Sequence, residues 1–149
     1  MQKRRLGTIL ILLGTLLLAG ALGLLGYNQW DSTRAEKAAD RVLTRLEEAI
    51  AEPRTIYPGD AAEPAVDTEM PVGTIDGCDY IGYLSIPSIG LALPVMQQWS
   101  YPGLKIAPGR YSGSLYTDDL VIAGHNYARH FSPLTQLTLG TEVLFVDMN

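Results

Sequence analysis

The stretch Asp79–Pro87 reads DYIGYLSIP, and it decides the fold expected for the second half of this 149-residue chain. It is rich in aromatic and β-branched residues and ends at a proline, which is typical of a strand. Three similar runs follow between Gly and Pro residues: LALPVM at 91–96, DLVIAG at 119–124 and TEVLFVD at 141–147. Short strands punctuated in this way predict a β-barrel or a β-sandwich.

A short helix is expected between the last two runs. Ser132 can cap it and Pro133 can open it, and the helix would then bury Leu134 and Leu137. Gly140 supplies a turn that leads into the final strand.

The third run delivers a histidine to a loop. VIAGHNYARH, at 121–130, is an apolar run that ends at Gly124 and is followed at once by His125. A strand that presents an imidazole in this way suits general acid–base catalysis, provided that a nucleophile lies nearby. His130 is expected to face solvent or to cap the short helix, and it is left out of the site.

The N-terminal part carries an apolar run long enough to cross a bilayer. Leu6–Gly26 contains no charged residue, and about 20 apolar residues in a helix span the hydrocarbon core. The basic cluster Lys3–Arg5 precedes this run, and the first charge beyond it is Asp31. The positive-inside rule therefore predicts a cytoplasmic N-terminus and an extracellular C-terminal domain.

A cleaved secretory signal is the competing interpretation of the same run. The basic start, an apolar region at 6–18 and the small residues Ala19 and Ala21 would serve that purpose. Apolar residues continue beyond Ala21, which favours an uncleaved anchor. Both interpretations export the rest of the chain.

Two segments of different composition connect the apolar run to the strands. Small and apolar residues recur at helical spacing from Thr33 to Ile50, and Thr33 with Glu36 matches a capping box. This predicts an amphipathic stalk helix. It could line a membrane surface or pair with a partner, but light packing on its own domain is favoured because its apolar face is mostly alanine. Four prolines and several acids then predict a linker. The expected organisation is a basic tail at 1–5, a transmembrane helix at 6–27, the stalk at 28–52, the linker at 53–77 and a β domain at 78–149.

The charge of the chain disfavours nucleic acid as a partner, and its cysteine content excludes a disulfide within the chain. Three of the 11 Lys and Arg precede the apolar run, whereas all 16 Asp and Glu follow it. The exported part is strongly acidic, so nucleic acid is a poor partner for it. A single cysteine, Cys78, excludes an intramolecular disulfide. The sequence shows no metal-ligand spacing and indicates no cofactor.

The second half resembles a known enzyme family in several pieces and in their order. YIGYLSIPSIGLALPVMQ, APGRYSGS, LVIAGHNYARHFSPLTQL and TEVLFVD are similar to the N-terminal half of a sortase, the membrane-anchored cysteine transpeptidase of Gram-positive bacteria. The similarity covers roughly 76–149, and a membrane anchor followed by a stalk also suits the family. It implies a mostly β fold, here a partial sortase-like β-barrel out of eight strands, preceded by the transmembrane helix and the stalk.

The resemblance also implies an activity and its partners. In this family a cysteine thiolate attacks a carbonyl of a sorting-signal peptide on a surface protein, and an amine of the cell wall or of a pilin subunit resolves the thioester. His125 matches the catalytic histidine, which protonates the leaving amine and deprotonates the incoming one.

The departure from the family lies downstream of His125. The sortase cysteine and arginine follow the histidine on later strands, and neither is found here. Arg110 and Arg129 lie before the position of that cysteine, so neither inherits the arginine's role. Cys78 is a poor substitute because it lies in the linker beside a carboxylate that disfavours a thiolate.

Two functions follow from this departure. The chain is expected to be the N-terminal part of a longer sortase and to be inactive alone. The alternative is a non-catalytic, membrane-anchored sortase-like module that binds a peptide or a partner. Whether the chain is itself an enzyme stays open at the level of sequence.

Overall fold

The computed structural model describes residues 2–51 and 69–149. It divides into two compact units, one that ends at Arg34 and one that begins at Ala35. Most of the predicted linker, 53–77, lies outside the described residues.

A single α-helix, α1, forms the N-terminal part. It runs without a break from Gln2 to Ala51. The expected capping box at Thr33 is wrong, because the Thr33 hydroxyl donates to the carbonyl of Gln29 at 3.0 Å, one helical turn back. A threonine in this conformation sits inside a helix instead of starting one. The membrane-length segment and the stalk are therefore one continuous helix.

The first unit contains the apolar segment of α1. Beginning at Leu6, this helix is long and apolar enough to cross a membrane, with a mean hydropathy of 2.5 over its most apolar window, and a signal sequence would pass the same test. The side chains of the apolar segment are exposed within the unit. Tyr27 and Trp30 follow the segment with ring centroids 6.2 Å apart, and the Arg34 guanidinium lies 5.8 Å from the Trp30 ring centroid.

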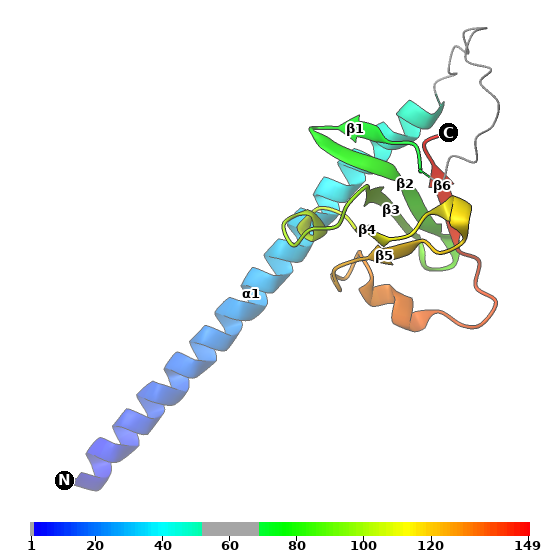
Figure 1. Ribbon diagram of the computed structural model, residues 1–149. Helices are drawn as coiled ribbons and strands as arrows, with labels where there is room; N and C mark the ends of the chain where they lie inside the picture. The colour runs from blue at the N-terminus through cyan, green and yellow to red at the C-terminus, as the bar shows by residue number, and fades with distance from the viewer. Residues whose placement is uncertain (1, 52–68) are drawn as a thin grey trace, which may run out of the picture. The chain divides into compact units, whose positions relative to one another are not determined.

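The second unit is built on one mixed sheet that is not closed. Its strands lie in the order β1-β2-β3-β4-β5, and β6 also pairs with β2 (Figure 1). All pairs are antiparallel except β3 with β4, which are parallel and meet at Met96 and Gly109. The strands are β1 Gly73–Ile75, β2 Cys78–Ile86, β3 Leu91–Met96, β4 Gly109–Ser112, β5 Val121–Ala123 and β6 Leu144–Asp147.

The strand predictions are confirmed, whereas the mostly β composition is not. Each of the four predicted runs contains a strand. However, α1 alone has 50 residues, more than the six strands together. The architecture is one long helix with an open six-stranded sheet.

The C-terminal part of α1 packs on its own domain, as predicted, but it contributes directly to the core instead of packing lightly. Val42 and Leu46 are buried in a cluster with Tyr80, Met96 and Met148. Full burial of a side chain such as Leu46 contributes about 1.5–3 kcal/mol. A second buried cluster contains Ala39, Met70, Ile81, Leu84, Ile86, Leu91, Leu93 and Val95.

The sheet begins earlier than the predicted boundary at residue 78. Gly73–Ile75 forms β1 and pairs with the start of β2 through a two-residue turn, in which Asp76 and Gly77 both have positive φ (51° and 77°). An Asp-Gly pair is typical of this tight hairpin turn. Asp76 also forms an ion pair with Arg45 of α1. This ion pair connects the β1–β2 hairpin to α1.

The predicted short helix is present as a 3₁₀ turn, η4, at Ser132–Gln136. Ser132 is not its cap; Phe131 occupies that position and makes no side-chain capping bond. Leu134 and Leu137 are partly buried against the core, as predicted.

Candidate functional site: a histidine loop after β5

The loop that follows β5 presents His125 to solvent. β5 is fixed by its pairing with β4, in which Ala123 lies opposite Gly109. At Gly124, a Cβ atom would lie 2.5 Å from the Phe131 ring, so only glycine allows this approach. The carbonyl of His125 accepts a hydrogen bond from the Phe131 amide at 3.1 Å. The loop thus folds back on itself, and the His125 side chain stays exposed.

An aromatic stack holds the His125 imidazole. Its ring lies on the Tyr127 ring with centroids 3.7 Å apart and planes 15° apart. Tyr127 is itself buried, and its carbonyl accepts hydrogen bonds from the amides of His130 and Ser132 at 3.0 and 3.3 Å. One imidazole face is therefore covered by an anchored ring, while the residue remains open to solvent. A group with this geometry can exchange protons with a bound substrate or with water.

His130 lies in the core beneath this stack, so its prediction as a solvent-facing or capping residue is wrong. It is fully buried, and its ring meets the edge of Tyr127 at a centroid distance of 5.3 Å. Neither ring nitrogen has a hydrogen-bond partner within the described part of the chain. Burial lowers the pKa of His130 from 6.5 to about 4, and the nearby His125 adds to this shift. His130 is therefore neutral near pH 7.

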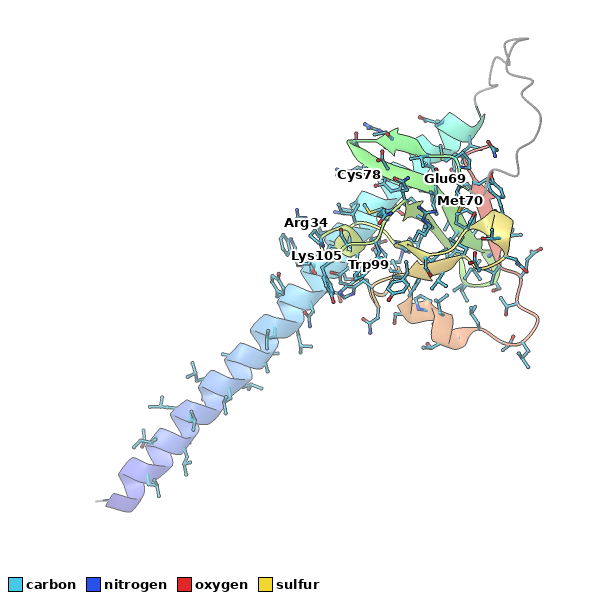
Figure 2. All side chains as sticks on the ribbon, in the orientation of Figure 1. Arg34, Glu69, Met70, Cys78, Trp99 and Lys105 are labelled. Atoms are coloured by element: carbon cyan, nitrogen blue, oxygen red, sulfur yellow. The ribbon has the colours of Figure 1, made fainter. Side chains whose placement is uncertain are left out.

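Cys78 lies in a different part of the sheet. It is the first residue of β2 and packs against the cluster beneath α1 (Figure 2). Burial raises the pKa of the neighbouring Tyr80 hydroxyl to about 12, with Cys78 and Asp76 as further causes.

The strand register measures the separation of Cys78 from the histidine loop. Tyr80 pairs with Met96, Met96 with Gly109, and Gly109 with Ala123, so these residues form one row across four strands. Three strand spacings amount to about 14 Å along the sheet. Cys78 and His125 also lie on opposite sides of that row. The structure does not bring the two side chains together.

The two arginines after β3 have partners outside the histidine stack. Arg110 Nε donates to the carbonyl of Gln97 at 3.0 Å. Arg129 Nε pairs with Glu36 of α1 at 3.1 Å. This ion pair lies in a groove between α1, the start of β3 and the loop before η4, and His125 is not among the residues that line the groove.

Neither a metal site nor a match to a known protein helps to identify the function. Across residues 2–51 and 69–149, no three His, Cys, Asp or Glu side chains are grouped so that they would hold a metal ion. Comparison of the chain with protein-family models, with curated proteins and with solved structures gave no match. The stack at His125, Tyr127 and His130 is thus the feature on which a function can be argued.

Proposed function

We propose that this chain is the N-terminal part of a membrane-anchored, sortase-like cysteine transpeptidase, with His125 as its general acid and base. The observation that carries the proposal is the exposed imidazole at the end of β5, held by the ring of Tyr127. The sequence similarity described above supplies the reaction class. His125 occupies the motif position of the catalytic histidine.

The two histidines differ in what they can contribute to a reaction. His130 is buried and neutral, so it has no access to a substrate. His125 is exposed and directed by a ring that is anchored in the core. A general acid and base needs both properties, because it must reach the reacting nitrogen and keep its orientation while the proton moves.

The open edges of the sheet support the placement of further strands. In the described part of the chain, β5 pairs with β4 alone and β6 with β2 alone. Strands that carry the cysteine and the arginine of a complete sortase would pair along the free edge of β5. The cysteine would then be close to His125, unlike Cys78.

In the proposed reaction, the thiolate on that added strand attacks the peptide carbonyl and forms a thioester. His125 gives its proton to the departing amine, which leaves as the new N-terminus of the cleaved segment. The acceptor amine then attacks the thioester, and His125 takes a proton from it as the thiolate is released. The proton on the imidazole is restored, and one peptide bond replaces another.

The N-terminal helix supports the membrane anchor. Tyr27 and Trp30 directly follow the apolar segment, at the position where aromatic side chains favour a membrane–water interface. The basic residues before the segment favour a cytoplasmic N-terminus, which would place the sheet outside the cell. The sorting-signal peptide and the cell-wall or pilin amine would be its partners there.

The direct test supplies the strands that the proposal requires. The full chain is fused to a sortase C-terminal half that carries the Thr-Cys and Arg strands, and cleavage of a fluorogenic sorting peptide is measured. We expect His125→Gln to reduce kcat/KM by at least about 10²-fold, the usual contribution of a general acid–base group. Gln136→Ala, an exposed change in the same segment, is the matched control and should leave the rate unchanged. Full activity of His125→Gln would refute the proposed role.

A non-catalytic module is the second candidate, and the remoteness of Cys78 from His125 favours it. Such a module would bind a sorting peptide without cleaving it. Fluorescence anisotropy of a labelled peptide with the full chain would detect this binding. Binding together with a folded but inactive fusion would select this candidate over the enzyme.

A further inference from the structure

The segment 97–111, here called the aromatic loop, comprises the connection between β3 and β4 and the first three residues of β4. The Trp99 amide donates to the Arg110 carbonyl at 3.0 Å, and the Arg110 side chain returns a bond to the Gln97 carbonyl. At Gly109, a Cβ atom would lie 2.8 Å from the Trp99 Cα, so the loop ends meet backbone to backbone. The base of the loop is therefore fixed.

Three aromatic side chains gather on this loop: Tyr101 and Tyr111 are exposed, and Trp99 is half-buried. The Trp99 and Tyr111 rings are stacked with centroids 5.7 Å apart, and the Tyr101 ring meets Trp99 edge-on at 5.4 Å. Tyr101 is 80% exposed and Tyr111 is 60% exposed. Exposed aromatic rings that gather in one patch mark an interaction site more often than isolated ones do.

The charge of this loop differs from that of the rest of the chain. The chain has a net charge of −5, yet no Asp or Glu lies between Asp79 and Asp118. Lys105 and Arg110 are the charged residues of that interval, and Lys105 is exposed. Trp99 and Lys105 both belong to this loop (Figure 2). The aromatic loop is thus a positively charged surface patch, rich in aromatic residues, on an acidic protein.

Chain connectivity limits how far the start of the sheet-bearing unit can be from the apolar segment. Seven residues separate Tyr27, which follows the apolar segment, from Ala35, the first residue of the sheet-bearing unit. Seven residues span at most about 25 Å even when fully extended. This short connection keeps the start of the sheet-bearing unit close to the end of the apolar segment.

We propose that the aromatic loop docks onto the headgroup interface of the membrane in which α1 is anchored, and that it prefers anionic phospholipids. Trp99, Tyr101 and Tyr111 would enter the interface, because Trp and Tyr are enriched at that depth. Lys105 would approach the lipid phosphates, because juxtamembrane basic residues are attracted to anionic lipid. This docking rests on the anchor in the proposed function, and it does not require transpeptidase activity.

The experiment uses the full chain reconstituted in vesicles. The protein has two tryptophans, so Trp30→Phe leaves Trp99 as the single reporter. We expect phosphatidylglycerol with brominated acyl chains to quench Trp99 emission and to shift it to the blue, with much weaker quenching in brominated phosphatidylcholine. Lys105→Glu should reduce the quenching in phosphatidylglycerol. As the matched control, Leu139→Trp in the Trp30→Phe/Trp99→Phe background places a reporter on a fully exposed loop outside the patch, and it should not be quenched.

Extraction with alkaline carbonate separates the failure of the docking from the failure of the anchor. If the chain stays in the membrane while Trp99 is quenched by aqueous iodide and not by brominated lipid, the docking is wrong and the anchor stands. Release of the chain by carbonate would overturn the anchor and the docking with it. Equal quenching in the two lipids would overturn the preference for anionic phospholipids. Protection of Trp99 by a cell-wall glycan in lipid-free detergent, without quenching by brominated lipid, would overturn the docking in favour of a glycan site.

Discussion

Acidification below pH 6.5 should destabilise the sheet-bearing unit through His130. The imidazole is fully buried, and its pKa falls from 6.5 to about 4 on folding. Between these values the unfolded chain binds a proton that the folded chain excludes, so the free energy of unfolding falls as pH falls. The contribution of neutral His130 to the free energy of unfolding is fully present above pH 6.5. It is lost as the pH falls from 6.5 through 4. A shift of this size corresponds to about 3 kcal/mol.

The assay is urea unfolding of the full chain in micelles, followed by Trp99 fluorescence in the Trp30→Phe background at a series of pH values. His130→Leu removes the titrating group and also two buried nitrogens that have no hydrogen-bond partner in the described residues. We therefore expect this variant to be at least as stable as the parent at pH 7, by up to about 1 kcal/mol. Its stability should change much less between pH 6.5 and 4, since only the carboxylates that both proteins share still titrate.

The second histidine provides the control for this assay. The chain contains only two histidines, and burial, to which His125 only adds, is the main cause of the low pKa of His130, so His125→Gln should keep most of the acid sensitivity of the parent. Two results would refute the reasoning. One is a parallel pH profile for His130→Leu and the parent. The other is a flattened profile for His125→Gln.

Three further predictions concern topology, reactivity and packing. In intact cells that express the chain, added protease should cleave beyond Tyr27 while an N-terminal epitope stays protected, and protection of both sides would contradict an anchored, exported domain. The chain alone should cleave a fluorogenic sorting peptide no faster than buffer does, because no thiol lies near His125; turnover that disappears in Cys78→Ala would contradict this. Gly82→Ala should cost about 3 kcal/mol in urea unfolding, because its Cβ would lie 2.0 Å from the Val146 carbonyl oxygen of β6. Gly90→Ala, where φ is also positive but no atom lies within 4 Å, should cost less, and equal losses would rule out the close approach as the cause.

The sequence reveals the longer strands because their patterns are local. DYIGYLSIP and LALPVM carry enough aromatic and branched residues to identify β2 and β3 without tertiary information. β4 contains only GRYS and joins β3 through a single parallel pair, so no periodicity marks it. β1 does carry a local signal, the Asp76-Gly77 turn, but the proline-rich composition before it favours a linker.

The candidate site is predictable in its position and not in its packing. Gly124 before His125 places an imidazole on a loop, and the structure has it there. The stack on Tyr127 depends on how that loop turns, which residue types alone do not determine. The burial of His130 contradicts the usual preference of an unpaired polar side chain for solvent, so a sequence rule assigns it to the surface. Likewise, Thr33 matches the sequence pattern of a helix start, but its hydroxyl donates to a carbonyl one turn back within a continuous helix.

The pairing of β2 with β6 has a consequence for how this protein is made. β2 receives β1 and β3 through short connections, whereas its partner residues in β6 follow about 60 residues later. At the usual speed of synthesis, the edge of β2 that β6 covers stays open for on the order of 3–12 s in the growing chain. During that time the apolar run around Ile81 and Leu84 can pair with other chains. A holding chaperone that recognises extended apolar segments would therefore act on the open edge of β2 before β6 is made.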